Sequence, residues 1–135
     1  VITVDAFSVG AIPVHLLTKE AIEVYLSRLA EDGIILFNIS TRYYHLRPVI
    51  KSTSATLNLF GVMNVPVPYE RLEAYQLSPN LVAVAREPRR LKVLTDRGWI
   101  RFSEKDGLPE VRPWTDDRID IITPFKEMLK IGGFY

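Results

Sequence analysis

The sequence predicts an α/β fold in which parallel strands alternate with helices and an antiparallel pair of strands lies at one edge of the sheet. Residues 1–4 (VITV) are all β-branched, which is typical of a strand buried on both faces of a parallel sheet. Residues 34–39 form a second apolar run, and a helical pattern over residues 18–31 separates the two runs. A strand, a helix and a strand with short links form a βαβ unit with parallel strands and a right-handed crossover.

The composition is that of one ordinary globular domain, and we treat residues 1–135 as a single domain. The chain is 47% hydrophobic and 24% charged, with a net charge of +1. This balance gives no electrostatic case for nucleic acid or for an anionic membrane surface, and no apolar run approaches a membrane span. The chain has no cysteine and only 2 histidines, so no metal site is expected, and a cytoplasmic protein fits.

Capping signals set the expected ends of the first helix. Thr18 suits the N-cap, and Glu20 suits the first turn, where an acid meets the positive end of the helix dipole. Apolar residues at helical spacing form one stripe, so this helix packs on one face of the sheet. Asp32 and Gly33 are predicted to end the helix, with Gly33 as a left-handed cap.

The second half of the chain predicts shorter elements. Pro48 suits the first turn of a second helix that extends to about Asn58. Residues 59–67 and 81–85 are predicted strands without a convincing long helix between them, so we expect an antiparallel, hairpin-like pair at the sheet edge. The rest is expected to be a short helix within residues 86–97, an irregular segment over 99–114 and a short amphipathic turn near the end of the chain.

A carboxylate stands where chemistry is expected in such a sheet. Asp5 directly follows the first predicted strand, and ligands of open α/β sheets bind beyond the carboxyl ends of the strands. Asn38 and Ser40 end the next strand, so they would lie at the same edge and face one crevice. The alternatives are that Asp5 only caps the loop that follows it, and that Asn38 and Ser40 serve turn chemistry.

Other polar residues allow two readings each. Asp116 and Asp117 could bind a cation or an amine, or they form a solvated acidic turn. His15 lies in an otherwise apolar stretch, where it lines the crevice or packs as a hydrogen-bonded histidine.

Several motifs resemble the spermidine synthase-like proteins, including a bacterial branch in which this domain is often fused to membrane segments. The motifs are ITVDAFS, IPVHLLT and DGI, followed by NIS-x-RY and later PWTDD. The resemblance covers most of the chain and is most specific over residues 1–43. It implies the second half of a Rossmann-like methyltransferase fold, and thus the carboxyl-terminal portion of a cytoplasmic domain whose parent protein could be membrane-tethered.

The resemblance also implies roles for individual residues. Asp5 corresponds to the catalytic aspartate that acts on the amine substrate of the aminopropyltransferases. Ser8 stands where the family has a second aspartate, which puts polyamine specificity in doubt. Ser8, Asn38 and one of two tyrosines, Tyr69 or Tyr75, would bind the substrate. The donor would be decarboxylated S-adenosylmethionine or S-adenosylmethionine.

Three functions remain open at this point. The first is aminopropyl transfer with Asp5 as base or amine anchor, because an amine must lose a proton before it attacks a sulfonium-activated carbon. The second is methyl transfer to a small molecule, and the third is a non-catalytic binding or dimerisation module. The expected partners are a small-molecule amine or another small acceptor and, in the third case, a second copy in a homodimer.

The sequence contains no glycine-rich nucleoside loop followed by an acidic residue for the ribose. The chain also begins within what we expect to be an interior strand, so we expect it to be part of a longer protein. We predict that the isolated chain binds no S-adenosyl compound with useful affinity. Titration calorimetry with methylthioadenosine checks this, and micromolar binding would contradict it.

Overall fold

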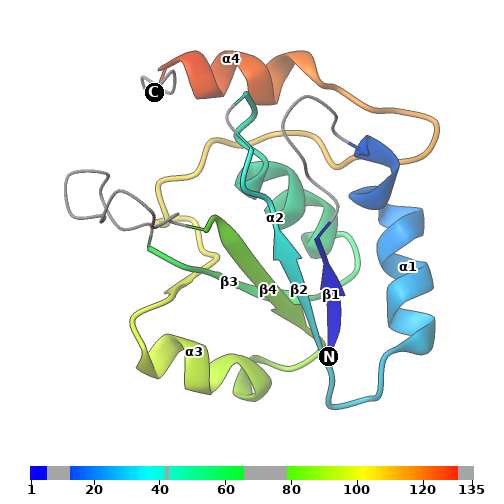
Figure 1. The fold of residues 1–135 in the computed structure, drawn as a ribbon, viewed down its shortest axis with the longest axis vertical. Coiled ribbons are helices and arrows are strands. Elements are labelled where there is room, and N and C mark those ends of the chain that lie inside the picture. Colours follow the sequence, from blue (N-terminus) through cyan, green and yellow to red (C-terminus); the bar gives the residue numbers. More distant parts are fainter. Residues whose placement is uncertain (6–12, 42, 66–78, 131–135) are drawn as a thin grey trace.

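The computed structural model describes residues 1–5, 13–41, 43–65 and 79–130, which form a mixed sheet with helices on both faces (Figure 1). The sheet has 5 strands in the order β1-β2-β4-β3-β5. The elements in chain order are β1 (Ile2–Val4), η1 (Val14–Leu16), α1 (Lys19–Arg28), β2 (Ile34–Asn38), α2 (Arg47–Ala55), β3 (Phe60–Met63), β4 (Leu81–Ala85), η3 (Pro88–Leu91), α3 (Lys92–Asp96), β5 (Ile100–Arg101) and α4 (Ile122–Lys130).

The βαβ unit predicted from the first third of the sequence is present. β1 and β2 are parallel, and Val4 lies opposite Phe37 at the carboxyl end of the pair. β3 and β4 form the expected antiparallel pair, but β4 is inserted between β2 and β3 and is antiparallel to both. β1, β2 and β3 therefore run in one direction and β4 runs in the other (Figure 1).

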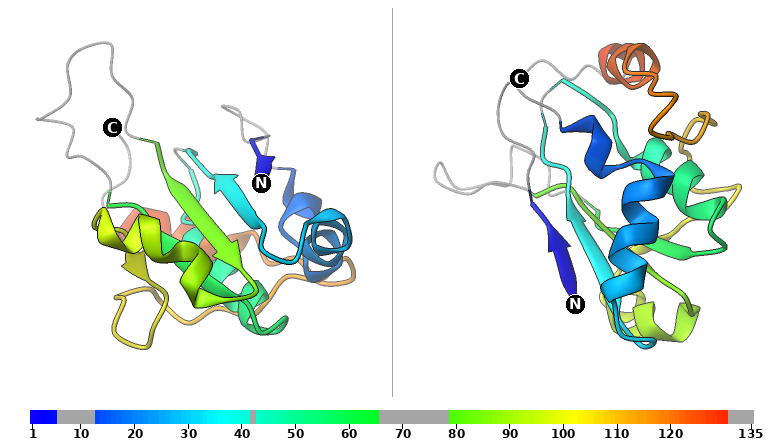
Figure 2. Two further views of the ribbon diagram at one scale, coloured as in Figure 1. Left: turned by 90° about the horizontal axis from the view of Figure 1, so that it is seen from below. Right: turned by 90° about the vertical axis from the view of Figure 1, so that its right-hand side faces the viewer.

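Alternation along β4 divides the core into two layers. Val82 and Val84 pack in the larger apolar cluster, which includes Ile22 of α1, Ile50 of α2 and the fully covered Trp114. Successive side chains of a strand point to opposite faces, so the neighbouring alanines of β4 lie in the smaller cluster. That cluster is completed by Leu91 of η3, which places α1 and α2 on one face and the η3–α3 segment on the other (Figure 2).

The first two predicted helices are present, but both end earlier than predicted. α1 ends at Arg28, three residues before the expected limit, with Leu29 as its C-cap. Gly33 does not have a positive φ, so it is not a left-handed cap. A Cβ atom at Gly33 would lie 2.5 Å from Leu29 Cδ1, so the requirement for glycine is close packing. The second helix ends at Ala55 rather than near Asn58.

The predicted strands also differ in their limits. β3 spans Phe60–Met63 within the expected range 59–67, and β4 matches its expected range of 81–85. The segment expected to be irregular contains β5, which pairs with β3, and the expected terminal turn is the helix α4.

The prediction that β1 is buried on both faces is wrong for the described residues. β1 pairs only with β2 there, at one edge of the sheet, and Thr3 is exposed on the face away from α1. Val4 is buried in the larger core cluster. A run of β-branched residues shows that a strand forms, but it cannot show which strands flank it.

The N-cap of α1 joins this helix to the late segment that contains Asp116. Thr18 is fully buried. Its hydroxyl accepts a hydrogen bond from the Ala21 amide (3.3 Å) and donates one to Asp116 Oδ1 (2.7 Å). We expect Thr18→Ala to lower the free energy of unfolding by about 1–2 kcal/mol in urea denaturation, because it removes a cap and leaves polar partners unsatisfied.

Two variants test whether the cap causes this loss. Thr18→Ser keeps the hydroxyl and should recover most of the stability. Thr56 is an exposed residue whose hydroxyl donates to the Thr53 carbonyl, and Thr56→Ala should change stability by less than about 0.5 kcal/mol. Equal losses in Thr18→Ala and Thr56→Ala would contradict the role of the cap.

Candidate functional site

Asp5 lies at the carboxyl edge of the sheet beside Asn38, as the sequence predicts. The register that pairs Val4 with Phe37 places the next residues, Asp5 and Asn38, next to each other. Asn38 Nδ2 donates a hydrogen bond to Asp5 Oδ1 over 3.0 Å. Asp5 is exposed, so its carboxylate is held by a neighbour and remains accessible to a ligand.

Ser40 and Asn80 continue the polar edge beyond β2. Asn38 Oδ1 accepts hydrogen bonds from the Ser40 hydroxyl (2.6 Å) and from the Ser40 amide (3.3 Å). The Asn80 amide donates to Ser40 Oγ (2.9 Å), and the Asn80 carbonyl accepts from the Ile39 amide (2.8 Å). Asn80 directly precedes β4, so the reversed strand brings its first residues to the edge at which β2 ends.

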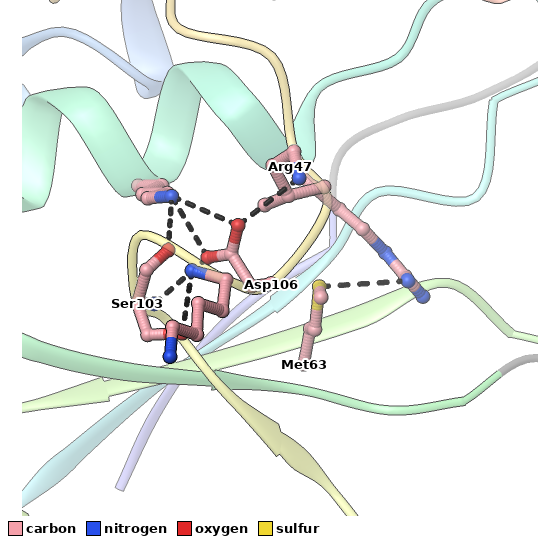
Figure 3. Close-up of polar contacts among 7 residues, drawn as sticks. Arg47, Met63, Ser103 and Asp106 are labelled. Atoms are coloured by element: carbon pink, nitrogen blue, oxygen red, sulfur yellow. Dashed lines mark hydrogen bonds and ion pairs between the residues drawn. The ribbon is translucent and has the colours of Figure 1, made fainter.

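Arg47, the first residue of α2, lies beneath this edge and is only 8% exposed. Its Nε donates to Asn80 Oδ1 (2.5 Å), and its Nη2 donates to the carbonyl (2.9 Å) and Oδ1 (3.0 Å) of Asn64. Asn64 follows β3, so one guanidinium joins the end of β3 to the beginning of β4. Figure 3 shows the Arg47 guanidinium reaching toward the sulfur of Met63, which is 3.7 Å from Nη1.

Burial lowers the pKa of Arg47 from its usual value, because removing a cation from water disfavours the charged form. An arginine remains protonated even so, because its ordinary pKa is far above neutral. In the part of the chain that the structure describes, no carboxylate lies within ion-pair distance of Arg47. Its charge is stabilised by amide and carbonyl oxygens instead.

α4 is attached to the same end of the molecule, toward which β1 and β2 point in Figure 1. The His45 amide donates to the Pro124 carbonyl (3.0 Å), and the rings of Tyr44 and Phe125 pack with centroids 5.9 Å apart. Burial lowers the pKa of His45, the Arg47 charge lowers it further, and Glu127 of α4 partly opposes both. All but the Glu127 contribution therefore favour the neutral form of the His45 imidazole.

A large cavity lies away from Asp5, which is not among its lining residues. It has a volume of about 910 Å³ and is formed by α2, β3, β5 and the segment that follows β5. Lys51, which lines this cavity, forms an ion pair with the covered Asp106 (Nζ to Oδ2, 2.8 Å). Figure 3 shows Asp106 beside Ser103, whose backbone amide donates a hydrogen bond to Asp106 Oδ2. Burial raises the pKa of Asp106, but hydrogen bonds from Lys51 and two backbone amides outweigh it and lower the pKa.

Asp116, a candidate binding residue that lies away from Asp5, makes a structural contact with α1. Asp116 accepts the Thr18 hydrogen bond, and its own amide donates to Glu20 Oε2 (2.9 Å), so it fastens the late segment to α1. Asp117 is exposed. His15 lines a smaller cavity of about 420 Å³ beside α1, together with Glu20 and Asp116.

Three predicted substrate-binding residues, Ser8, Tyr69 and Tyr75, lie outside the described residues. Among the described residues, no group of three or more histidine and acidic side chains is arranged to hold a metal ion. None of the helices in that part of the chain has the length and apolar character needed to cross a membrane.

Comparisons with protein-family models, with curated proteins and with solved structures found no match to this chain. Function must therefore be argued from the site itself. The sequence did not predict roles for Arg47, Asn64 and Asn80, which organise the edge. Polar residues just beyond predicted strand ends were the available signal, but the pairing of β4 with β2 was needed to bring them together.

We expect Arg47→Lys to lower the free energy of unfolding by about 2 kcal/mol, because an ammonium group cannot replace the fork of donors that joins Asn64 to Asn80. Urea denaturation followed by circular dichroism measures the change. Arg28→Lys, at an exposed position of α1, is the matched control and should change stability by less than about 0.5 kcal/mol. Equal effects of the two substitutions would contradict the role assigned to Arg47.

Proposed function

We propose that this chain is the acceptor-binding half of a Rossmann-like transferase that uses an S-adenosyl-type donor and resembles the polyamine aminopropyltransferases. The observation that carries the proposal is the exposed Asp5 carboxylate at the carboxyl end of β1, with one oxygen held by Asn38. The strand order β1-β2-β4-β3, with β4 reversed, supports the fold assignment because the second half of such a fold ends in an antiparallel pair.

The chemistry of aminopropyl transfer suits a carboxylate at this place. An amine is protonated at neutral pH, so it must lose a proton before its nitrogen lone pair attacks the carbon bound to the sulfonium. The new C–N bond forms as the C–S bond breaks, and the bonding electrons pass to sulfur to give a neutral thioether. Asp5 would hold the ammonium form and take its proton, with Oδ1 bound to Asn38 and Oδ2 directed to the amine.

Methyl transfer to a small acceptor is the second candidate. Asp5 contacts the neutral side-chain amide of Asn38, which in turn binds the neutral hydroxyl of Ser40. Ser8 also stands where the family has a second aspartate. One carboxylate provides weaker recognition of a dication than two, which favours an acceptor other than a diamine.

Product analysis distinguishes the two reactions. The polypeptide encoded by the complete reading frame is incubated with putrescine as a diamine and with either decarboxylated or intact S-adenosylmethionine, and products are identified by mass spectrometry. We expect an aminopropylated amine with the decarboxylated donor, and a methylated product with the intact donor would select the second candidate.

Asp5→Asn should lower kcat/KM by about 100-fold or more, because it removes the base while keeping the size of the side chain. Asp32→Asn is the matched control, since Asp32 is exposed and precedes the amino end of β2, whereas Asp5 follows the carboxyl end of β1. Equal activity of these two variants, or the absence of any transfer product, would overturn the proposal.

A further inference from the structure

A continuous hydrogen-bond chain connects the buried Arg47 with the exposed Asp5. Arg47 Nε donates to the side-chain oxygen Oδ1 of Asn80 (2.5 Å). The backbone amide of Asn80 donates to Ser40 Oγ (2.9 Å). The Ser40 hydroxyl donates to Asn38 Oδ1 (2.6 Å), and Asn38 Nδ2 donates to Asp5 Oδ1 (3.0 Å). This series of hydrogen bonds thus runs from α2 through the beginning of β4 to the ends of β2 and β1.

The direction of each bond follows from the chemistry of the groups. A backbone amide can only donate, so Ser40 Oγ must accept from Asn80 and its hydroxyl hydrogen is left for Asn38. The Ser40 amide also donates to the same Asn38 oxygen (3.3 Å), which identifies that atom as the carbonyl oxygen of the side chain. The NH₂ group of Asn38 must then face Asp5.

We propose that Ser40 is a positioning residue, which fixes the side-chain amide of Asn38 so that its NH₂ group always faces Asp5. This inference rests on the proposed function of Asp5. A serine that served only its own turn would bond nearby backbone, whereas Ser40 joins the side chain of residue 38 to the amide of residue 80. Ser40 is exposed, so its hydroxyl acts through these bonds and not through packing.

The role requires one atom that accepts and donates at the same time. Alanine at position 40 would leave the Asn80 amide without its acceptor and Asn38 Oδ1 without its shorter hydrogen bond. The Asn38 amide could then rotate, and Asp5 would lose a fixed donor. Threonine retains the hydroxyl, and position 40 is exposed.

Amide hydrogen exchange measured by NMR tests the structural part of the proposal on this chain. Ser40→Ala should increase the exchange rate of the Asn80 amide by about 10-fold or more. The Leu81 amide, which donates to Asn64 Oδ1 (2.8 Å), should keep its rate. Ser40→Thr should behave like the parent. The control Ser27→Ala removes an exposed hydroxyl that bonds the Val24 carbonyl of α1, and it should leave both rates unchanged.

The functional part is measured on the polypeptide from the complete reading frame. Ser40→Ala should lower kcat about 10-fold with little change in the KM of the donor, and Ser40→Thr should restore it to within about 3-fold. Unchanged exchange at Asn80 in Ser40→Ala overturns the hydrogen-bond chain, and lost protection with unchanged kcat overturns the positioning role. If Asp5→Asn also keeps full activity, the proposed function of Asp5 fails instead, so the two failures are distinguishable.

Discussion

The parallel pairing of β1 with β2 is the constraint on which the site depends. Parallel strands end at the same edge of a sheet, so the register that places Val4 opposite Phe37 also places Asp5 beside Asn38. A shift of one residue would turn Val4 out of the core, where it is 7% exposed. The apolar core therefore fixes the position of a polar group that makes no contribution to that core.

The reversed strand β4 supplies the rest of the edge. Because β4 is antiparallel to both β2 and β3, its first residues lie where those strands end. Asn80 can therefore bind Ser40 on one side and Arg47 on the other. A parallel strand in the same place would bring its carboxyl end to this edge, and Asn80 would be at the far side of the sheet.

Burial of Arg47 explains why two asparagines meet at this edge. A guanidinium removed from water must have its donors satisfied, since an unpaired buried charge is costly. Two asparagine side chains and a carbonyl meet that need and are thereby fixed themselves. Hydrogen bonds through Asn80, Ser40 and Asn38 link Arg47 to the exposed surface, where the Asp5 carboxylate is accessible to solvent.

The sequence by itself determined the βαβ unit, the N-cap at Thr18, the antiparallel pair of late strands and the position of Asp5 and Asn38 at one edge, because hydrophobic period and capping chemistry are local properties. The tertiary structure decided that β4 lies between β2 and β3, that β1 is an edge strand of the described sheet, and that Arg47, Asn64 and Asn80 meet. Strand order depends on long-range pairing, and contacts between residues as distant as 40 and 80 depend on strand order. No local pattern of residues specifies either one.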